Sequence, residues 1–403
     1  MKSRFTSDEK KAMLGLSGVL AARMLGFSLI LPMFSNYSTR VLHATPIEAG
    51  LAFGVYGLSQ ALLQIPFGAL SDRIGRKTTV AFGLVIFIVG SVVAALSTTI
   101  VGLTIGYFLQ GAAAIASTIL AWMTDAIDVS RRNVGMAVIG MSIGASFVIG
   151  LPLASVVFAH YGGPAVFWIC VALGTIALVL VLFALHEPAS HQYREIDEGT
   201  SLASLVSNRD LAILSAGGAL VYLTMRAIFF VVPLQMQVLG ISQGKLYMCC
   251  GIVGALVMGS GSRQSDKGRA RVFIFLSFAL TLIGYLMLWH FGTEATPYAV
   301  GYGVWFAGFS VLQALLPGAV SKIARPGARG TTLGFFNTCQ YIGAAFGGPL
   351  GGRLAGVPTE LYLVLVAMTA LVMVGVMALR QVDRIGTVAS DEAVNGSPSK
   401  AVS

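Results

Sequence analysis

Residues 68–77 read Gly68-Ala69-Leu70-Ser71-Asp72-Arg73-Ile74-Gly75-Arg76-Lys77, a short charged stretch between two long apolar segments, 47–70 and 77–97. Each apolar segment is long enough for a helix to cross a bilayer, which takes about 20 residues. The two ends of a turn this short lie on the same face of the membrane. The second segment therefore crosses the bilayer in the direction opposite to the first. The stretch therefore predicts two neighbouring membrane-spanning helices joined by a tight polar turn.

The composition of the whole chain also indicates a membrane protein. Of its 403 residues, 56% are hydrophobic and 11% are charged, and the mean hydropathy is +0.82. Soluble domains carry roughly 25% charged residues to cover their surface, and this chain lacks them. Its four cysteines all fall inside apolar segments, with no spacing typical of a disulfide framework or a metal site. We expect no metal, no cofactor and no enzymatic activity.

The pattern predicts an all-α membrane protein with twelve membrane-spanning helices. We expect the spans at residues 11–36, 47–70, 77–97, 99–121, 134–159, 163–185, 211–238, 242–261, 270–290, 296–318, 331–355 and 358–380.

The distribution of basic residues predicts the orientation of these spans. If the N-terminus and every second loop are cytoplasmic, Arg40, Lys245 and Arg353 lie outside, and Arg23 and Arg226 lie within helices. All the other Lys and Arg residues then face the cytoplasm, as the positive-inside rule requires. The net charge of +9 therefore reflects membrane orientation and not nucleic-acid binding. We expect both termini to be cytoplasmic.

The two halves of the chain resemble each other. Residues 143–146, Ile-Gly-Ala-Ser, recur as Ile-Gly-Ala-Ala at residues 342–345. Parallel repeats of this kind place a binding site near the membrane midplane, between the halves. We expect two pseudo-symmetric six-helix bundles and a short polar tail. Their boundaries are 1–185 for the N-terminal bundle, 186–210 for a cytoplasmic linker, 211–384 for the C-terminal bundle and 385–403 for a disordered cytoplasmic tail.

The charged stretch matches a family signature at every fixed position. Residues 68–77 follow the pattern G-x-L-x-D-R-x-G-R-K, and they come after Tyr56-Gly57-Leu58-Ser59-Gln60-Ala61 and Arg23-Met24-Leu25-Gly26. Together these residues resemble the major facilitator superfamily and, within it, the YajR-like branch of bacterial drug:proton antiporters. The superfamily resemblance extends over about residues 10–384, and the branch resemblance rests mainly on residues 20–150. It implies a multi-pass transporter of the bacterial inner membrane.

This resemblance implies a conformational latch. We call its members the latch residues, and they are Gly68, Asp72, Arg73, Gly75, Arg76 and Asp125. In the family, the aspartate faces the start of helix eleven, here about residues 330–333, and the last arginine pairs with an acid that Asp125 matches. These contacts are expected only while the cytoplasmic side is closed. Glycines suit close packing and a tight turn, and an arginine can bind a carboxylate through two parallel hydrogen bonds. A plainer interpretation is a cluster that only anchors topology.

Two glycine- and proline-rich spans are predicted to act as gating structure rather than as substrate contacts. Glycine allows helices to approach closely, and proline removes a backbone donor and bends a helix. Ordinary helix packing explains the same residues. The expected gating residues are Gly144, Gly150, Pro152, Gly347 and Pro349.

In the membrane interior the chain departs from the antiporter pattern. Tyr107 stands where the antiporter motif R-x-x-Q-G has an arginine. Every acidic residue falls in a loop, a tail or a helix end, although proton coupling commonly uses a buried carboxylate. The groups expected at mid-depth are positive, Arg23 and Arg226. They predict either an anion site between the halves or structural arginines satisfied by backbone carbonyls.

Amphipathic and aromatic residues of the expected interior are the other candidates for substrate contact. Each of them is also compatible with ordinary core packing. The full list of substrate-binding candidates is Arg23, Tyr107, Gln110, Tyr222, Arg226, Phe229, Gln235, Asn337 and Gln340.

The sequence thus predicts a secondary active transporter that exports small organic, drug-like compounds by alternating access. The expected partners are a small-molecule substrate, the lipid bilayer and protons or another counter-ion, and we expect a monomer. An organic-anion exchanger or uniporter that uses Arg23 and Arg226 is the alternative. A membrane receptor that transports nothing is a weaker alternative.

Overall fold

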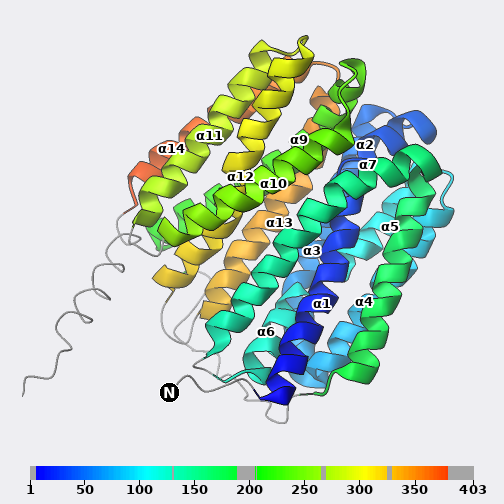
Figure 1. Cartoon of the computed structure of the whole chain (residues 1–403), viewed down its shortest axis with the longest axis vertical. Coiled ribbons are helices and arrows are strands. Elements are labelled where there is room, and N and C mark those ends of the chain that lie inside the picture. The colour runs from blue at the N-terminus through cyan, green and yellow to red at the C-terminus, as the bar shows by residue number, and fades with distance from the viewer. Residues whose placement is uncertain are drawn as a thin grey trace, which may run out of the picture.

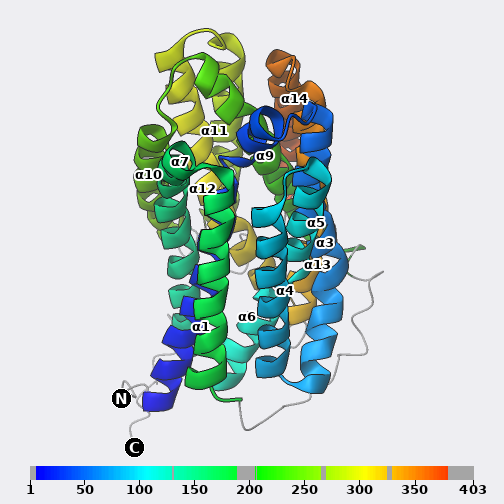
Figure 2. The same cartoon turned by 90° about the vertical axis from the view of Figure 1, so that its right-hand side faces the viewer.

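The computed structural model describes residues 6–128, 131–187, 207–264, 269–324 and 329–379, together with Leu205. Within these ranges the chain forms helices and no strand, as expected for an all-α membrane protein. Most of the long helices run side by side along one long axis (Figures 1 and 2). Most of the predicted linker and the whole predicted tail lie outside the described residues, so the expectations for them stay predictions.

The first half of the chain supplies the helices that surround the latch. They are α1 (Ser7–Ile30), α2 (Phe34–Asn36), the π-helix η1 (Tyr37–Val41), α3 (Pro46–Ile74), α4 (Arg76–Leu96), α5 (Ile100–Ala112), α6 (Ala116–Ala126), α7 (Arg132–Val179) and the π-helix η3 (Leu180–Ala184).

The second half supplies a matching set of long helices. They are α9 (Arg209–Val238), α10 (Gln243–Gln264), α11 (Ala270–His290), α12 (Ala295–Ile323), α13 (Arg329–Leu354) and α14 (Pro358–Met377).

The helices of the described residues are consistent with twelve spans. Eight helical stretches are long and apolar enough to cross a membrane by length and composition. One of these, Val134–Ala184, contains a break at Gly162, where φ is 78° and ψ is −178°. A positive φ suits glycine because it has no Cβ, and the break falls between the predicted spans 134–159 and 163–185. Three further helices lie outside the eight: α3 and α13, which are rich in glycine and polar residues, and α10, whose apolar part is Gln243–Gly259.

The predicted span 99–121 falls almost entirely within one stretch long and apolar enough to cross a membrane, Ile100–Ala126, but the helix is interrupted inside it. The structure ends α5 at Ala112 and starts α6 at Ala116. Between them the chain makes short-range hydrogen bonds, from the Ala114 amide to the Ala112 carbonyl and from the Ile115 amide to the Ala113 carbonyl. Apolar periodicity does not reveal this break, because the residues around it are all compatible with a helix. The break leaves backbone carbonyls that a side chain can bind.

Two of the helices begin with the same capping box. Thr6 and Glu9 at the start of α1, like Thr45 and Glu48 at the start of α3, exchange side-chain and backbone hydrogen bonds. These boxes satisfy backbone donors that have no partner inside the helix. They mark the two ends of the bundle. We call the end where α1, α4 and α13 begin the basic end, and the end where α3 begins the opposite end.

The two halves contact each other through α3 with α13, α7 with α10, and α2 with α9. Near the opposite end, α3 and α13 pack with no room for side chains. A Cβ added to Gly50 would lie 2.6 Å from the Gly348 carbonyl oxygen, and one added to Gly57 would lie 2.6 Å from the Ala345 amide. An added Cβ at Gly54 would clash with the Ala345 carbonyl oxygen.

At the basic end, there is open space beside one glycine of each of these two helices. A Cβ added to Gly68 of α3 or Gly334 of α13 would meet nothing within 4 Å. The buried apolar side chains around Leu16, Val80 and Trp122 form a cluster confined to the first half, whereas the larger cluster spans both halves. At the described glycines, α3 and α13 are therefore in backbone contact at the opposite end and have open space beside them at the basic end.

Candidate functional site

The turn between α3 and α4 is fixed by Gly75. Its φ of 94° and ψ of 156° lie in a region that side chains rarely adopt, which explains the glycine of the signature. The Glu187 carboxylate lies beside it and accepts hydrogen bonds from the backbone N–H groups of Arg76, at 2.6 Å, and Lys77, at 2.9 Å. Carboxylates are favourable at this position because a helix N-terminus exposes N–H donors and a positive dipole. Lys77 in turn donates from Nζ to the Leu182 and Leu185 carbonyls.

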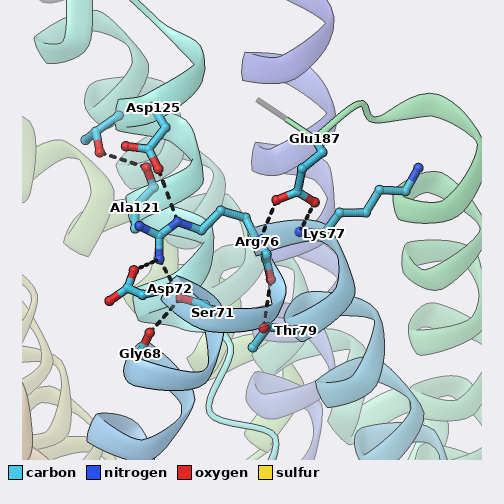
Figure 3. A network of polar contacts seen from close by, with 11 residues as sticks. Gly68, Ser71, Asp72, Arg76, Lys77, Thr79, Ala121, Asp125 and Glu187 are labelled. Atoms are coloured by element: carbon cyan, nitrogen blue, oxygen red, sulfur yellow. Dashed lines mark hydrogen bonds and ion pairs between the residues drawn. The ribbon is translucent and has the colours of Figure 1, made fainter. Parts of the chain in front are cut away.

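Arg76 is the centre of the polar network in Figure 3. Its Nε donates to Asp125 Oδ2 at 3.1 Å, and its Nη1 contacts both Asp72 Oδ1 and Ser71 Oγ. Ser71 Oγ in turn donates a hydrogen bond to the Gly68 carbonyl at 2.8 Å. The side chain of Arg76 is 16% exposed, so these charges interact more strongly than they would in open water.

The structure brings most of the latch residues together and leaves two apart. Arg73 is exposed and makes none of these contacts, and Gly68 packs against nothing on its Cβ side. Asp72 does not reach the start of α13 in this arrangement, because its side chain is 62% exposed and turns back to Arg76. The expectation that the pair of Arg76 and Asp125 needs a closed basic end does not hold here. Both residues belong to the same half.

A second polar contact ties the start of α1 to the loop before α7. Glu9 accepts a hydrogen bond from the Asp128 amide at 3.1 Å and forms an ion pair with Arg131. Glu9 lies in the polar first turn, before the apolar stretch 11–36. The Thr6 amide, followed by the Asp128 amide and the Arg131 charge, holds the pKa of Glu9 below its usual value against a partial opposing effect of burial.

Arg226 of α9 crosses from the second half into the first. Its Nη1 donates to the Tyr107 hydroxyl at 2.7 Å. Its guanidinium carbon lies 5.0 Å from the ring of Phe27, 4.6 Å from that of Phe53, 5.0 Å from that of Tyr56 and 5.7 Å from that of Tyr107. Cation–π contacts are worth about 2 kcal/mol or more when water is excluded. We call these four rings the aromatic cage.

Arg23 of α1 stays within the first half. Its Nη2 donates to the Ala113 carbonyl at 2.7 Å, at the break between α5 and α6, and makes a longer contact of 3.5 Å with Gln60 Oε1. The side chain is 1% exposed. The hypothesis that a backbone carbonyl satisfies Arg23 therefore holds for one of its three side-chain nitrogens, Nη2.

The profile of the Major Facilitator Superfamily matches residues 16–348, which is most of this chain. The chain belongs to the major facilitator superfamily. It is therefore a membrane transport protein and not an enzyme, as the signature at residues 68–77 indicated.

Relatives and solved structures agree with this membership. The inner membrane transport protein YajR of Escherichia coli K12 is 33% identical over 361 residues, 88% of this chain and 79% of that protein. Multidrug resistance protein 2 of Bacillus subtilis is 28% identical over 200 residues, 48% of each chain. The crystal structure of a D-xylose-proton symporter has a TM-score of 0.75 at 12% identity, over 92% of this chain and 98% of that one.

The substrate-binding candidates of this major facilitator protein divide into two groups. Near the interface between the halves, Tyr107 and Arg226 bond to each other, and the half-buried Tyr222 contacts Tyr341 edge-on with ring centroids 6.0 Å apart. Asn337 is also half-buried. Gln340 is buried and packs against Gly218 of α9.

Three of the candidates have structural partners instead. Gln110 donates to Ser91 Oγ at 2.7 Å between α5 and α4. Phe229 packs against Trp305 within the second half, with ring centroids 6.1 Å apart. Gln235 donates to the Gly292 carbonyl at 2.8 Å, near the opposite end. In this arrangement these three side chains act in packing, and their predicted substrate role has no structural support.

The predicted gating residues also occupy two kinds of place. Pro349 lies at the interface, because a Cβ added to Gly54 of the other half would lie 2.7 Å from its Cδ, whereas Gly347 packs within the second half, where an added Cβ would lie 2.7 Å from Arg226 Cβ. Gly144 faces Met258 of the other half at 3.5 Å. Gly150 packs against Ser28 within the first half. Pro152 lies within α7, where the residues on both sides of it remain helical.

Sequence reasoning missed three parts of the site. The first is Glu187, the carboxylate that caps α4. The second is the group of rings from Phe27, Phe53 and Tyr56 around Arg226. The third is the set of small residues on α3, whose spacing of Gly50, Gly54 and Gly57 is the only one of these signals that is legible in the sequence.

Proposed function

We propose that this protein is a secondary active transporter that exports small organic, drug-like compounds by alternating access. The observation that carries the proposal is the contrast along α3 and α13. These helices touch through glycine at the opposite end and are apart at the basic end. A rocking motion of one half against the other reverses this contrast around a central site.

The charge pattern supports a cytoplasmic location for both termini and for the basic end. With that orientation, the arrangement described above is the one open to the cytoplasm, where an exporter loads its substrate. The latch residues would then stabilise the reverse arrangement, in which Asp72 meets the start of α13. We propose that a monomer suffices, because the two halves of one chain supply both sides of the site.

The residues between the halves support an organic substrate. The aromatic cage, together with Tyr222 and Tyr341, offers large apolar faces with few fixed polar groups. Such surfaces bind bulky organic molecules largely through their area, with modest demands on shape. The similarity to a multidrug resistance protein of Bacillus subtilis supports the same substrate class.

Coupling is expected to differ from that of typical proton antiporters. Tyr107 replaces the arginine of the antiporter motif and donates no charge to the site. Among the described residues, each Asp and Glu lies at a helix end or in a connection. We therefore propose that a pH gradient drives transport only weakly, since the carboxylate that commonly exchanges a proton is missing from the middle of the membrane.

The alternative function is exchange or uniport of an organic anion by Arg23 and Arg226. It requires both guanidinium groups to reach one substrate. Arg226 would first have to leave Tyr107 and the aromatic cage, which surround it in this arrangement. A receptor that transports nothing is disfavoured, because that function does not explain why α3 and α13 pack closely at one end and not at the other.

The test is a flux assay with the purified protein in liposomes. Uptake of a cationic dye and of an organic anion is measured with and without a pH gradient, against empty liposomes. We expect saturable dye transport that changes less than twofold when the gradient is removed. Preferred transport of the anion would favour the alternative, and dye transport that is proportional to the pH gradient would contradict the coupling proposal. No flux of either probe, with labelling at the two ends that never alternates, would reject transport itself.

A further inference from the structure

Arg23 carries a buried positive charge that the described protein groups leave largely uncompensated. Two of its nitrogens, Nε and Nη1, are buried and have no hydrogen-bond partner. Its neighbour Gln60 is 1% exposed, and the Nε2 of that side chain is also buried without a partner. Gln60 Oε1 lies 3.5 Å from Arg23 Nη2, so the side-chain amide of Gln60 lies beside the guanidinium of Arg23.

Arg226 shows how the same charge is compensated elsewhere in the chain. Four aromatic faces surround its guanidinium and the Tyr107 hydroxyl accepts a hydrogen bond from its Nη1, although its Nε is also buried without a hydrogen-bond partner. Within the described ranges, Arg23 has no ring over it and no carboxylate beside it, and one carbonyl is its short-range partner. Burying an ion without such partners is strongly unfavourable.

We infer that Arg23 and Gln60 form a binding site for a small monovalent anion, a halide such as chloride or a small carboxylate. Arg23 Nε and Nη1 lie on different edges of the planar guanidinium, so one of them, together with Gln60 Nε2, can donate to the same small anion. One negative charge cancels the one positive charge, which removes the penalty of an isolated buried ion. A divalent phosphate would leave a net negative charge in the same buried place.

The anion is a resident ligand in this inference and not the transported substrate. Arg23 and Gln60 belong to α1 and α3 of one half, and both are almost completely buried. Arg23 also holds the break between α5 and α6 through the Ala113 carbonyl. Anion binding would therefore stabilise the first half as a unit, whether or not the proposed transport direction and substrate are right.

Thermal unfolding of the full chain in lipid nanodiscs tests the inference. Melting is followed in sodium gluconate while chloride, bromide or acetate is added at constant ionic strength. We expect a saturable rise in the midpoint of about 2 °C or more, because a ligand that binds only the folded state stabilises it. A stronger response to halides identifies a halide site, and a stronger response to acetate identifies a carboxylate site.

Substitutions locate the site. Arg23→Gln should abolish the dependence on anion identity, and Arg23→Lys should retain part of it because the charge remains. Gln60→Leu should raise the anion concentration needed for half of the effect about tenfold, since it removes a hydrogen bond to a charged ligand. Arg226→Gln is the matched control. It removes an equally buried arginine from the other half and should keep the anion dependence.

Two results would overturn the inference. The first is a wild-type midpoint that is the same in gluconate, halide and acetate, which would mean that water satisfies Arg23. The second is an anion effect that persists in Arg23→Gln, which would place the ligand elsewhere. If Arg23→Gln does not fold, the broadening of the chloride-35 NMR line is compared between the wild-type protein and Gln60→Leu. Loss of broadening in Gln60→Leu supports the site, and equal broadening in both proteins overturns it.

Discussion

The two ends of the α3–α13 pair differ in what lies between the helices. At the opposite end, glycines allow backbone to lie against backbone, and an added methyl group at Gly54 would clash with the Ala345 carbonyl. At the basic end, charged side chains of α3, α4 and α6 bond to one another, and the glycines Gly68 and Gly334 face open space.

This difference separates a steric seal between the two halves from ion pairs within one half. Close packing of backbones has a steep distance dependence, so it is lost with small movements. Ion pairs act over longer distances and keep part of their strength while helices move. We interpret the glycine contacts as the feature that defines one closed state, and the latch residues as a bias on the other.

The largest expected effect is a direct attack on the steric seal. Gly54→Ala places a methyl group against the Ala345 carbonyl and the Pro349 ring. Overpacking costs about 1–3 kcal/mol, a shift of about 5- to 150-fold away from the closed opposite end. The opening is measured at Phe230, which is buried and whose ring centroid lies 6.1 Å from that of Phe53 across the interface. Phe230→Cys is introduced into a cysteine-free protein and alkylated. Its alkylation rate should rise by that factor.

The control for this experiment is Gly334→Ala, at the other end of the pair. Its added methyl group meets nothing within 4 Å in this arrangement, so the labelling of Phe230→Cys should stay within twofold of the parent. Equal labelling in Gly54→Ala and Gly334→Ala would mean that the two ends do not differ as described.

A smaller effect is expected from Arg226→Gln, which empties the aromatic cage between the halves. The loss of cation–π contacts should loosen the opposite end about tenfold or more in the same labelling assay, because such contacts are worth about 2 kcal/mol when dry. Arg226→Lys should lose less, since it keeps the charge. Unchanged labelling in Arg226→Gln, together with loss of anion transport, would instead support a substrate-binding role.

The latch residues should give a shift of the opposite sign. Asp72→Asn removes the carboxylate that is proposed to meet the start of α13 when the basic end closes, and it should populate the state open at the basic end about 2- to 5-fold more. Arg76→Ala should not raise this population, because its contacts with Asp72 and Asp125 already exist while the basic end is open and lie within one half.

Labelling of Gly334→Cys at the basic end measures the latch effect. Arg73→Ala is the control, because Arg73 is exposed and makes none of the described latch contacts. If Arg73→Ala changes the labelling as much as Asp72→Asn does, the effect reflects the charge of the loop and not the proposed contact of Asp72 with α13.

The smallest expected effect is a dependence on pH at the basic end. The folded-state pKa of Glu9 is lowered from 4.5, chiefly by the hydrogen bond from the Thr6 amide. A lowered folded pKa means that the carboxylate stabilises the fold above pH 4.5, and that this contribution disappears as the pH falls through the folded value. Glu9→Gln should therefore melt at a lower temperature than the wild type at neutral pH, and the difference should shrink in acid. A difference that grows as the pH falls would contradict this assignment.

Much of this protein could be predicted from its sequence. Apolar segments of membrane-spanning length predicted the helices, because the bilayer forces the backbone to satisfy its own hydrogen bonds. The stretch 68–77 identified the superfamily, and the need for a positive φ explains the glycine at position 75. The pair of Arg76 with Asp125 followed from resemblance.

The partners of the buried arginines could not be predicted. Periodicity marks Arg23 and Arg226 as unusual in an apolar helix, but it carries no information on which distant ring, carbonyl or amide faces them. Tyr107 and Arg226 are 119 positions apart and bond across the interface. From the sequence alone, both interpretations of these arginines, an anion site and a structural role, therefore stay open.

The sequence by itself determined the membrane environment, the helical spans, the two related halves and the charged turn, because these depend on local composition and spacing. Only the tertiary structure decided which end is sealed, where α5 gives way to α6, and how each arginine is compensated. These features depend on contacts between segments far apart in the chain, and a few ångströms of backbone approach decide whether a glycine seals an interface or faces open space.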